Sequence, residues 1–406
     1  MAETLPQLRM DLDFMPSPLR ERPGLLIRDP YHYSDATLII PPVLVQVLSL
    51  FDGQATDLDL RAALVQLTGE LDVTPLVEHL RSALNDAGFL DNESYHRLRE
   101  QRHREFAESP TRLAAHAGSA YPASPADFRE VFDGYFAAAG PIEAASDGLL
   151  GIAAPHVSPE GGWESYRDAY RLLGPQYKDR VFAILGTSHY GAPQRFGLTR
   201  KNFATPLGEA RTERGMVDFL AAQAPAAIEM EDYCHSSEHS IEFQVAFLQH
   251  LYGPDIRILP ILCGSYAKSL YEGGMPEDDP NVARFLAALG EMHAREKGGL
   301  LWVLGIDMAH MGQRYGDPFA AVADRDEMAA VARRDQERIE RIESGDASGF
   351  WEQVQQNRDD LKWCGSAPVY TFLKAVPEAR ARTLRYQQWN IDPQSVVSFA
   401  AMAFRE

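Results

Sequence analysis

Three short apolar runs constrain the fold of this chain more than any other feature. Residues 149–154, 181–185 and 301–304 carry no charge, and each run passes through small residues before it ends on polar ones. Stretches with helical periodicity separate the runs, and this alternation is typical of a sheet covered by helices. We therefore predict an α/β fold with a mixed central sheet flanked by helices.

Hydrophobic periodicity also places the other elements of this region. Helices are expected over residues 163–173, 212–222, 238–251, 281–296, 324–342, 348–356 and 369–376. A further strand is expected over 256–262. The chain closes with two strand-like runs, 382–389 and 395–404, which suggest an edge hairpin.

The first part of the chain has a different pattern and reads as a separate small α+β module. Two short strands, 25–28 and 36–40, precede three helical stretches at 43–51, 58–67 and 74–87. Residues 96–109 are dense in charge, and 114–125 hold small residues and prolines typical of a connection. We place the domain boundary at 110, which gives domains 1–110 and 111–406.

Composition excludes several classes of protein. The formal net charge of −19 argues against nucleic-acid binding, which depends on Lys and Arg neutralising phosphates. No apolar run approaches the ~20 residues that a membrane span needs, so no membrane partner is expected. Three cysteines, an odd and sparse set, give no disulfide framework and favour a reducing, cytoplasmic location.

Histidines follow the apolar runs at comparable positions. His156 and His189 each come just after a run, and His310 follows the third run in Asp307-x-x-His310. Ligands bind at the carboxyl ends of strands in open α/β sheets, so these side chains are expected to converge. Neutral imidazole is the commonest transition-metal ligand. The alternative is that each histidine only caps its strand.

A fourth histidine opens a predicted helix in Glu238-His239-Ser240. Ser237 is expected to be the N-cap of that helix, with Glu238 as a favourable anion in its first turn. In a functional role, Glu238 and His239 would point into the cleft and exchange protons or orient a ligating histidine. Asp307 would similarly fix the tautomer of His310, unless it merely caps the following loop.

One cysteine has a context that favours the thiolate. Cys364 comes just before the predicted helix at 369–376, and a helix N-terminus lowers the pKa of a thiol. An inert buried thiol is the alternative, and Cys263, inside a predicted strand, fits that description better. Cys234, near the histidines at 235 and 239, stays ambiguous.

With these residues in place, the chain resembles the Memo family, protein B of the AmmeMemoRadiSam gene grouping. The resembling segments run in family order: GIAAPH (151–156), LGTSHYG (185–191), ATPLGE (204–209), SSEHSIEFQVAFLQ (236–249), LPILCGS (259–265), GIDMAHMG (305–312), WCGSAPVYTFLK (363–374) and VVSFAAMAF (396–404). The resemblance implies a fold similar to class III extradiol dioxygenases and a metal site at His156, His189 and Cys364. Residues 157–163 depart from the aromatic, glycine-rich stretch that often follows the first motif. The first module resembles PqqD-like winged-helix domains, which bind leader peptides.

These observations lead to two main hypotheses. The first is a redox enzyme, an oxygenase for example, that uses iron(II) or copper(I), with zinc as a third candidate. His156, His189 and Cys364 would be ligands, and Asp307, His310, Glu238 and His239 would handle protons or orient the ligands. The alternative is a non-catalytic protein that binds copper or a peptide and acts with a radical SAM partner. A cysteine nucleophile at Cys364 is a third hypothesis, and the substrate is expected to be a small molecule or a peptide.

Overall fold

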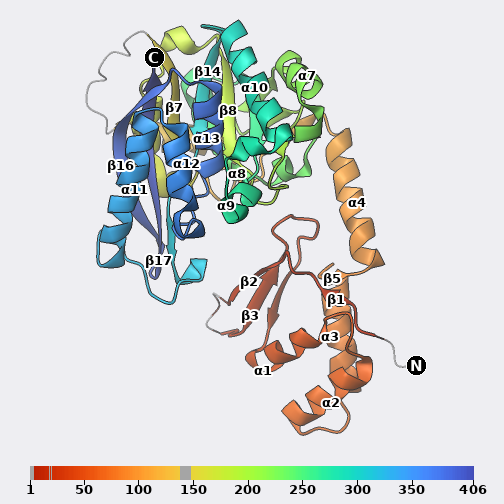
Figure 1. Cartoon of the computed structure of the whole chain (residues 1–406). Helices are drawn as coiled ribbons and strands as arrows, with labels where there is room; N and C mark the ends of the chain where they lie inside the picture. Colours follow the sequence, from red (N-terminus) through yellow and green to blue (C-terminus); the bar gives the residue numbers. More distant parts are fainter. Residues whose placement is uncertain (1–3, 18, 20, 138–147) are drawn as a thin grey trace. The chain divides into compact units, whose positions relative to one another are not determined.

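The computed structural model describes residues 4–17, 19, 21–137 and 148–406, which are drawn in Figure 1. The chain divides into two compact units, Met1–Glu108 and Ser109–Glu406, whereas the sequence placed the boundary at 110. We describe each unit by itself.

The first unit combines a small antiparallel sheet with helices. Its elements are β1 (Gln7–Leu8), β2 (Asp13–Pro16), β3 (Leu25–Arg28), β4 (Thr37–Ile40), α1 (Pro42–Val45), α2 (Asp57–Thr68), α3 (Thr74–Asp86), β5 (Leu90–Asp91) and α4 (Glu93–Glu108). Strands β2, β3 and β4 form one sheet, and β1 pairs with β5. Both predicted strands are present, but β1, β2 and β5 were not predicted.

One predicted helix of this unit is broken. The stretch 43–51 forms the short helix α1 and then a 3-10 helix over Gln46–Leu50. Valines at 43, 45 and 47 explain the break, because β-branched side chains lose rotamer freedom in an α-helix.

The core of the first unit includes a buried ion pair. Arg9 is 3% exposed, and its guanidinium donates to Asp29 Oδ2 and to the Gly88 carbonyl, both at 3.0 Å. The same group lies 4.0 Å from the centre of the Tyr95 ring. Arg9 therefore links three parts of the first unit.

The second unit is built on one large mixed sheet. Its strands are β6 (Thr111–Arg112), β7 (Leu149–Ala154), β8 (Val181–Thr187), β9 (Phe196–Leu198), β10 (Asn202–Thr205), β11 (Gly208–Thr212), β12 (Ile228–Met230), β13 (Arg257–Cys263), β14 (Leu300–Gly305), β15 (His310–Gly312), β16 (Arg380–Asp392) and β17 (Ser395–Arg405). The central order is β17-β7-β14-β8-β13. Strands β7, β14, β8 and β13 are parallel, and β17 pairs antiparallel with β7. The predicted mixed α/β sheet is confirmed.

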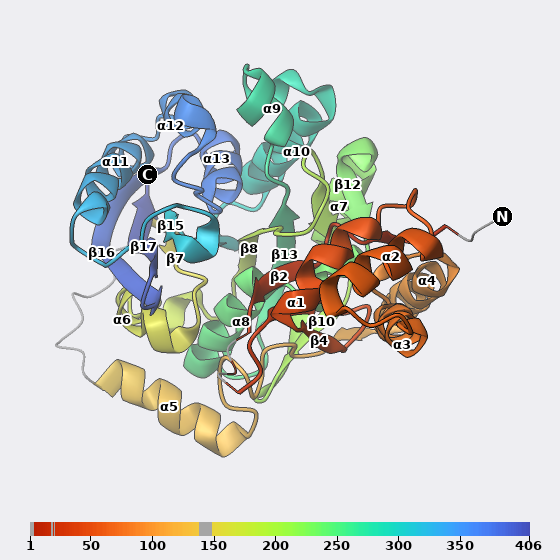
Figure 2. The same ribbon diagram turned by 90° about the horizontal axis from the view of Figure 1, so that it is seen from below.

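Helices cover both faces of this sheet. They are α5 (Pro125–Ala137), α6 (Pro159–Tyr170), α7 (Arg214–Gln223), α8 (His239–Tyr252), α9 (Ala267–Glu272), α10 (Pro280–Arg295), α11 (Glu327–Glu343), α12 (Ala347–Gln355) and α13 (Ser366–Ala375). Figure 2 shows α6 and α8 on one side of the sheet and α10, α12 and α13 on the other. Each helix predicted for this unit is present, with ends shifted by a few residues.

Two separate apolar cores explain why the central strands carry no polar alternation. In β8, Val181, Ala183 and Leu185 pack into the core under α10 and α13. The intervening Phe182 and Ile184 pack into the core under α6 and α8. Successive side chains of a strand point to opposite faces, so a strand buried on both faces must be apolar throughout.

The closing hairpin forms as predicted. Strands β16 and β17 pair with each other, β17 joins the hairpin to β7, and β16 is the outer strand. Strand β17 is fully buried along Ser395–Phe404, whereas β16 is only half-buried. An interior strand needs apolar side chains on both faces, and the run VVSFAAMAF supplies them.

Within the part of the chain that the structure describes, no helix is both long enough and apolar enough to cross a lipid bilayer.

Candidate metal centre

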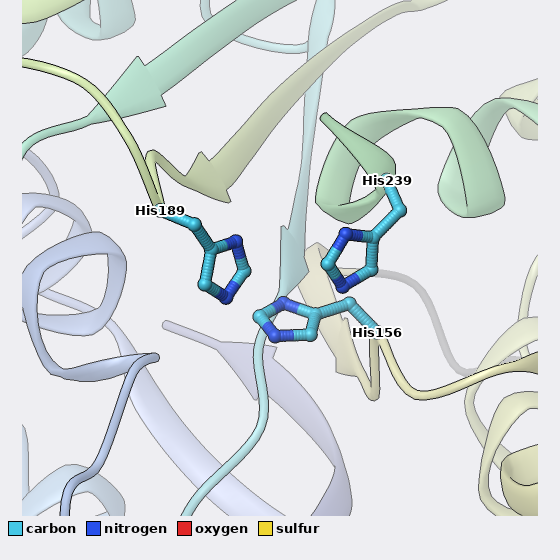
Figure 3. A group of neighbouring side chains, drawn as sticks. All are labelled: His156, His189 and His239. Atoms are coloured by element: carbon cyan, nitrogen blue, oxygen red, sulfur yellow. The ribbon is translucent and has the colours of Figure 1, made fainter. Parts of the chain in front are cut away.

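Three histidines meet at the carboxyl ends of the parallel strands. His156 follows β7, His189 follows β8, and His239 is the first residue of α8. One ring nitrogen from each lies within 4.8 Å of those of the other two. Figure 3 shows the three rings converging from these separate elements.

Two glycines let the start of α8 approach the strands this closely. A Cβ atom on Gly186 would lie 2.5 Å from Ser240 Oγ, and one on Gly305 would lie 2.2 Å from the Ser240 carbonyl oxygen. Neither distance is tolerable for a larger residue. The small residues that end the apolar runs therefore make room for the helix that carries His239.

His156 is held by the main chain and is 1% exposed. Its Nδ1 lies 2.9 Å from the Gly305 carbonyl oxygen, which can only accept, so Nδ1 carries a proton and donates. Its Nε2 lies 3.2 Å from Cys364 Sγ and 3.4 Å from Asp307 Oδ2. This tautomer leaves the Nε2 lone pair directed into the site.

His189 and His239 are held by one carboxylate, Glu238, which is 2% exposed. His189 Nδ1 donates to Glu238 Oε2 at 3.0 Å, and His239 Nδ1 lies 3.2 Å from Oε1. The carboxylate also accepts the backbone N–H groups of His189, His239 and Ser240 at 2.9–3.1 Å. Glu238 thus orients both imidazoles through their Nδ1 atoms.

His189 and His239 share the Glu238 carboxylate, but the pKa values of their imidazoles are shifted in opposite directions. Burial lowers the pKa of His189, but the Glu238 carboxylate and the Cys364 sulfur outweigh it and hold that pKa well above its usual range. Burial and the positive His189 beside it hold the pKa of His239 well below its usual range, despite Glu238. The pKa of Glu238 is lowered well below its usual range, because the histidines more than offset its burial.

Cys364 completes the group from the far end of the chain. It precedes α13, and its carbonyl accepts from Thr187 Oγ1 at 2.9 Å. Burial raises the pKa of its thiol, but the His156 and His189 imidazoles reverse this and lower it overall. A thiol with a lowered pKa deprotonates readily, as a metal ligand must.

Asp307 and His310 hold the main chain around the site, and Asp307 Oδ2 also faces His156 Nε2 at 3.4 Å. Asp307 Oδ1 accepts the backbone N–H of His156 at 2.9 Å, and burial raises the pKa of this carboxyl to about 6. His310 Nδ1 lies 2.9 Å from the Met308 carbonyl oxygen and 3.1 Å from that of Lys362. His310 therefore fixes the loop that carries Cys364, and burial lowers its pKa.

The neighbouring polar residues differ from the sequence predictions in detail. The N-cap of α8 is Glu238 itself and not Ser237, because the carboxylate reaches the first two free N–H groups of the helix. Cys263 is buried in β13, and burial raises the pKa of its thiol to about 12. Cys234 is also buried, and burial together with Asp232 raises the pKa of its thiol. Neither of these two thiols is activated.

Sequence reasoning missed a segment that borders the site. Residues 114–125 connect β6 with α5, as expected, but His116 and Tyr121 within this stretch and Arg112 just before it also contact the beginning of α8. Their partner Glu242 is fully buried and lies about one turn after His239. A charged residue within an apolar helix face was the available signal, since buried carboxylates need partners.

The donor set suits a transition metal. In all three histidines Nδ1 faces a protein oxygen, the arrangement that orients metal-binding imidazoles and raises their basicity. Imidazole nitrogens together with a thiolate match iron, copper or zinc. The residues predicted as ligands, His156, His189 and Cys364, lie together, and the His239 ring nitrogen lies within 4.8 Å of those of His156 and His189.

Known proteins identify the family of this chain. A family model described as Memo-like protein matches residues 112–403. A MEMO1 family protein of Aquifex aeolicus is 25% identical over 388 residues, 93% of this chain and 95% of that protein. A MEMO1 family protein of Thermococcus kodakarensis is 28% identical over 72% of this chain and 99% of its own length. The Protein memo-1 homolog of Caenorhabditis elegans is 26% identical over 72% of this chain and 81% of its own length. Because the family model covers well over half of the residues, this protein belongs to the Memo-like protein family.

Proposed function

We propose that this protein binds a redox-active transition metal, iron(II) or copper(I), and acts as an oxidoreductase. Zinc would bind the same donors without redox chemistry. His156, His189 and Cys364 are the proposed ligands, and His239 is a fourth donor beside them. The metal would supply electron transfer or the activation of dioxygen.

One observation carries this proposal. Three imidazoles from different elements have Nδ1 engaged by a carbonyl or carboxylate oxygen, while the ligand atoms of the three residues lie within 4.8 Å of one another. A histidine that only capped a strand would not need this alignment, and three such histidines would not need to meet. The thiol of Cys364, with its lowered pKa, adds a soft donor at 3.2 Å from His156 Nε2.

The remaining residues have positioning roles in this proposal. Glu238 orients two imidazoles, Asp307 holds the main chain at His156, and His310 holds the loop of Cys364. The outer edge of the site stays accessible, because 26% of the His189 side chain and 33% of the His239 side chain are exposed. A small molecule or a peptide side chain would enter from that edge.

Metal analysis of protein purified without oxygen tests the proposal. We expect about one iron or copper per chain in the wild type, and none in a double variant His156→Ala and Cys364→Ala. Cys263→Ala is the matched control, because its thiol is buried in the apolar core and not among the proposed ligand atoms, so the metal should be kept. Stoichiometric metal in the double variant would contradict the assignment of His156 and Cys364 as ligands.

Metal binding without turnover is the second candidate function, and the fourth donor favours it. Three protein ligands leave room for a substrate, whereas four close a tetrahedral centre. X-ray absorption of the metal-loaded protein separates the two. Fewer than four protein donors, with oxygen consumption on addition of a reductant, supports the enzyme, and a closed centre with no oxygen uptake supports the binding protein.

A further inference from the structure

The segment that opens the second unit lies against the first turn of α8. Strand β6 pairs parallel with β10, and the residues after it contact the turn that carries Glu238 and His239. The family match also begins within β6, at residue 112. The segment thus belongs to the unit that holds the candidate metal centre, although it is distant from the centre in sequence.

Arg112 fixes the main chain of that turn. Its side chain is 1% exposed, Nε donates to the His235 carbonyl at 2.7 Å, and Nη2 donates to the Glu238 carbonyl at 2.8 Å. Nη1 donates to the Glu242 carboxylate. One guanidinium therefore sets where the backbone of Glu238 lies, and with it the carboxylate that orients His189 and His239.

Glu242 binds the segment to the helix. Its carboxylate accepts from Arg112, from the Tyr121 hydroxyl, and from the backbone N–H groups of Ala115 and His116 at 3.1 and 3.0 Å. The residue is fully buried, so these hydrogen bonds take the place of water around its carboxylate. The Arg112 guanidinium is the main charge beside this carboxylate, and its loss would leave a buried carboxylate without its ion-pair partner.

The His116 ring packs beside the His239 ring. Its Nε2 lies 2.8 Å from the Ser237 carbonyl oxygen, to which it donates, and its ring meets the His239 ring edge-on at 5.6 Å. The Phe243 ring lies 5.5 Å from His239 on another side. The imidazole of His239 is confined by the segment as well as by Glu238.

We propose that Arg112 and Glu242 are positioning residues of the metal centre, which hold the Glu238–His239 turn at the distance that the ligands require. This inference rests on the proposed metal-binding function. It assigns a role at the site to a segment that supplies no ligand, and it predicts that the guanidinium can be neither shortened nor replaced by an ammonium. An ammonium has the charge but not the fork that reaches two carbonyls and a carboxylate together.

Cobalt(II) titration of the full-length protein tests this, because the visible bands of cobalt(II) report both its affinity and the geometry of its ligands. For Arg112→Lys we expect affinity weaker by about 10- to 100-fold, the usual effect of disturbing residues that orient ligands, and altered bands at saturation. Arg9→Lys is the matched control. It makes the same change in a buried, carboxylate-paired arginine of the first unit, and it should leave affinity and bands unchanged.

The other outcomes are equally informative. A folded Arg112→Lys protein with wild-type affinity and bands overturns the positioning role while the metal site stands. A wild-type protein that binds no cobalt overturns the proposed function, and this inference with it. If Arg112→Lys does not fold, Tyr121→Phe replaces it, since it removes one donor to Glu242 and keeps the charge. We then expect a several-fold loss of affinity, and unchanged binding contradicts the proposal.

Discussion

The two sides of the histidine cluster are held by different means. On the inner side, made of His156, Asp307 and Cys364, His156 is 1% exposed and its Nδ1 donates to a strand carbonyl. On the outer side, made of His189, His239 and Glu238, about a quarter to a third of each imidazole is exposed, and one carboxylate orients both. On the inner side His156 is fixed by a strand carbonyl, whereas on the outer side both imidazoles are oriented by one carboxylate side chain.

This difference shows where the site tolerates change. A main-chain acceptor moves only if its strand moves, so the inner side should be as stable as the fold. The outer side depends on Glu238 and on the segment that holds its turn. Apart from the proposed ligands themselves, we expect substitutions of the groups that hold the inner side to affect unfolding, and substitutions of the groups that hold the outer side to affect metal affinity.

The largest effect is expected at Gly305, whose carbonyl orients His156. In Gly305→Ala, the new methyl group would lie 2.2 Å from the Ser240 carbonyl oxygen and 2.9 Å from Gln244 Nε2, so α8 must move away from β14. We expect a loss of about 4 kcal/mol in the free energy of unfolding, measured by urea denaturation. Gly290→Ala, where the nearest atom would be at 3.4 Å, is the control and should change little. Equal stability of the two variants would remove the steric argument for the inner side.

A pH-dependent effect is expected at His235, which precedes the outer-side turn. Burial, assisted by the nearby Arg112 guanidinium, lowers the pKa of His235 to about 4 from 6.5. The unfolded chain takes up this proton near pH 6.5 and the folded chain only near pH 4. The contribution of His235 to the free energy of unfolding is therefore fully present above pH 6.5. It falls by about 3 kcal/mol as the pH drops from 6.5 to about 4. His235→Gln keeps a donor for the Gly197 carbonyl and should flatten this part of the pH profile. Parallel profiles for the two proteins would contradict the prediction.

Matched carboxylate-to-amide changes compare the two sides directly. Glu238→Gln replaces an acceptor shared by two imidazoles, and we expect metal affinity to fall by about 10- to 100-fold, or about 2 kcal/mol. Asp307→Asn keeps an oxygen for the backbone N–H groups of His156 and Val157 and changes only the Oδ2 contact with His156 Nε2, so affinity should change only a few-fold. Chelator competition measures both. A larger effect at Asp307 would reverse the assignment of the sensitive side.

The smallest effect is expected in the loop that leads to Cys364. Arg358 is exposed and has φ of 55°, a left-handed conformation that is unfavourable for a residue with a side chain. Arg358→Gly should therefore raise the free energy of unfolding by about 1 kcal/mol, seen as a higher melting temperature. Arg358→Ala keeps the strain and serves as the control. No difference between the glycine and alanine variants would show that the loop carries no strain there.

The sequence predicts the parts of this molecule that depend on local pattern. His156 and His189 follow from apolar runs ending in small residues, because strand ends of a parallel sheet share an edge. Cys364 was predicted from its position before a helix and from the family resemblance. No periodic pattern links it to His156 and His189, because they lie 175 or more positions earlier in the chain. Arg112 and Tyr121 were missed because their partner Glu242 is over 100 residues distant. Short strands such as β1 and β5 were missed because two residues form a ladder only when the tertiary structure brings them together.

The position of Arg112 also has an evolutionary consequence. Glu108 ends α4 and the first unit, and the guanidinium that holds the outer side lies four residues later. A gene fusion or loss at this border leaves every group of the centre in place, provided that it spares the residues from 109 onward. Relatives that align with about 72% of this chain and nearly all of their own length fit such a history. The segment that begins at Ser109 thus belongs to the second unit, and a change at the border after Glu108 leaves the candidate centre complete.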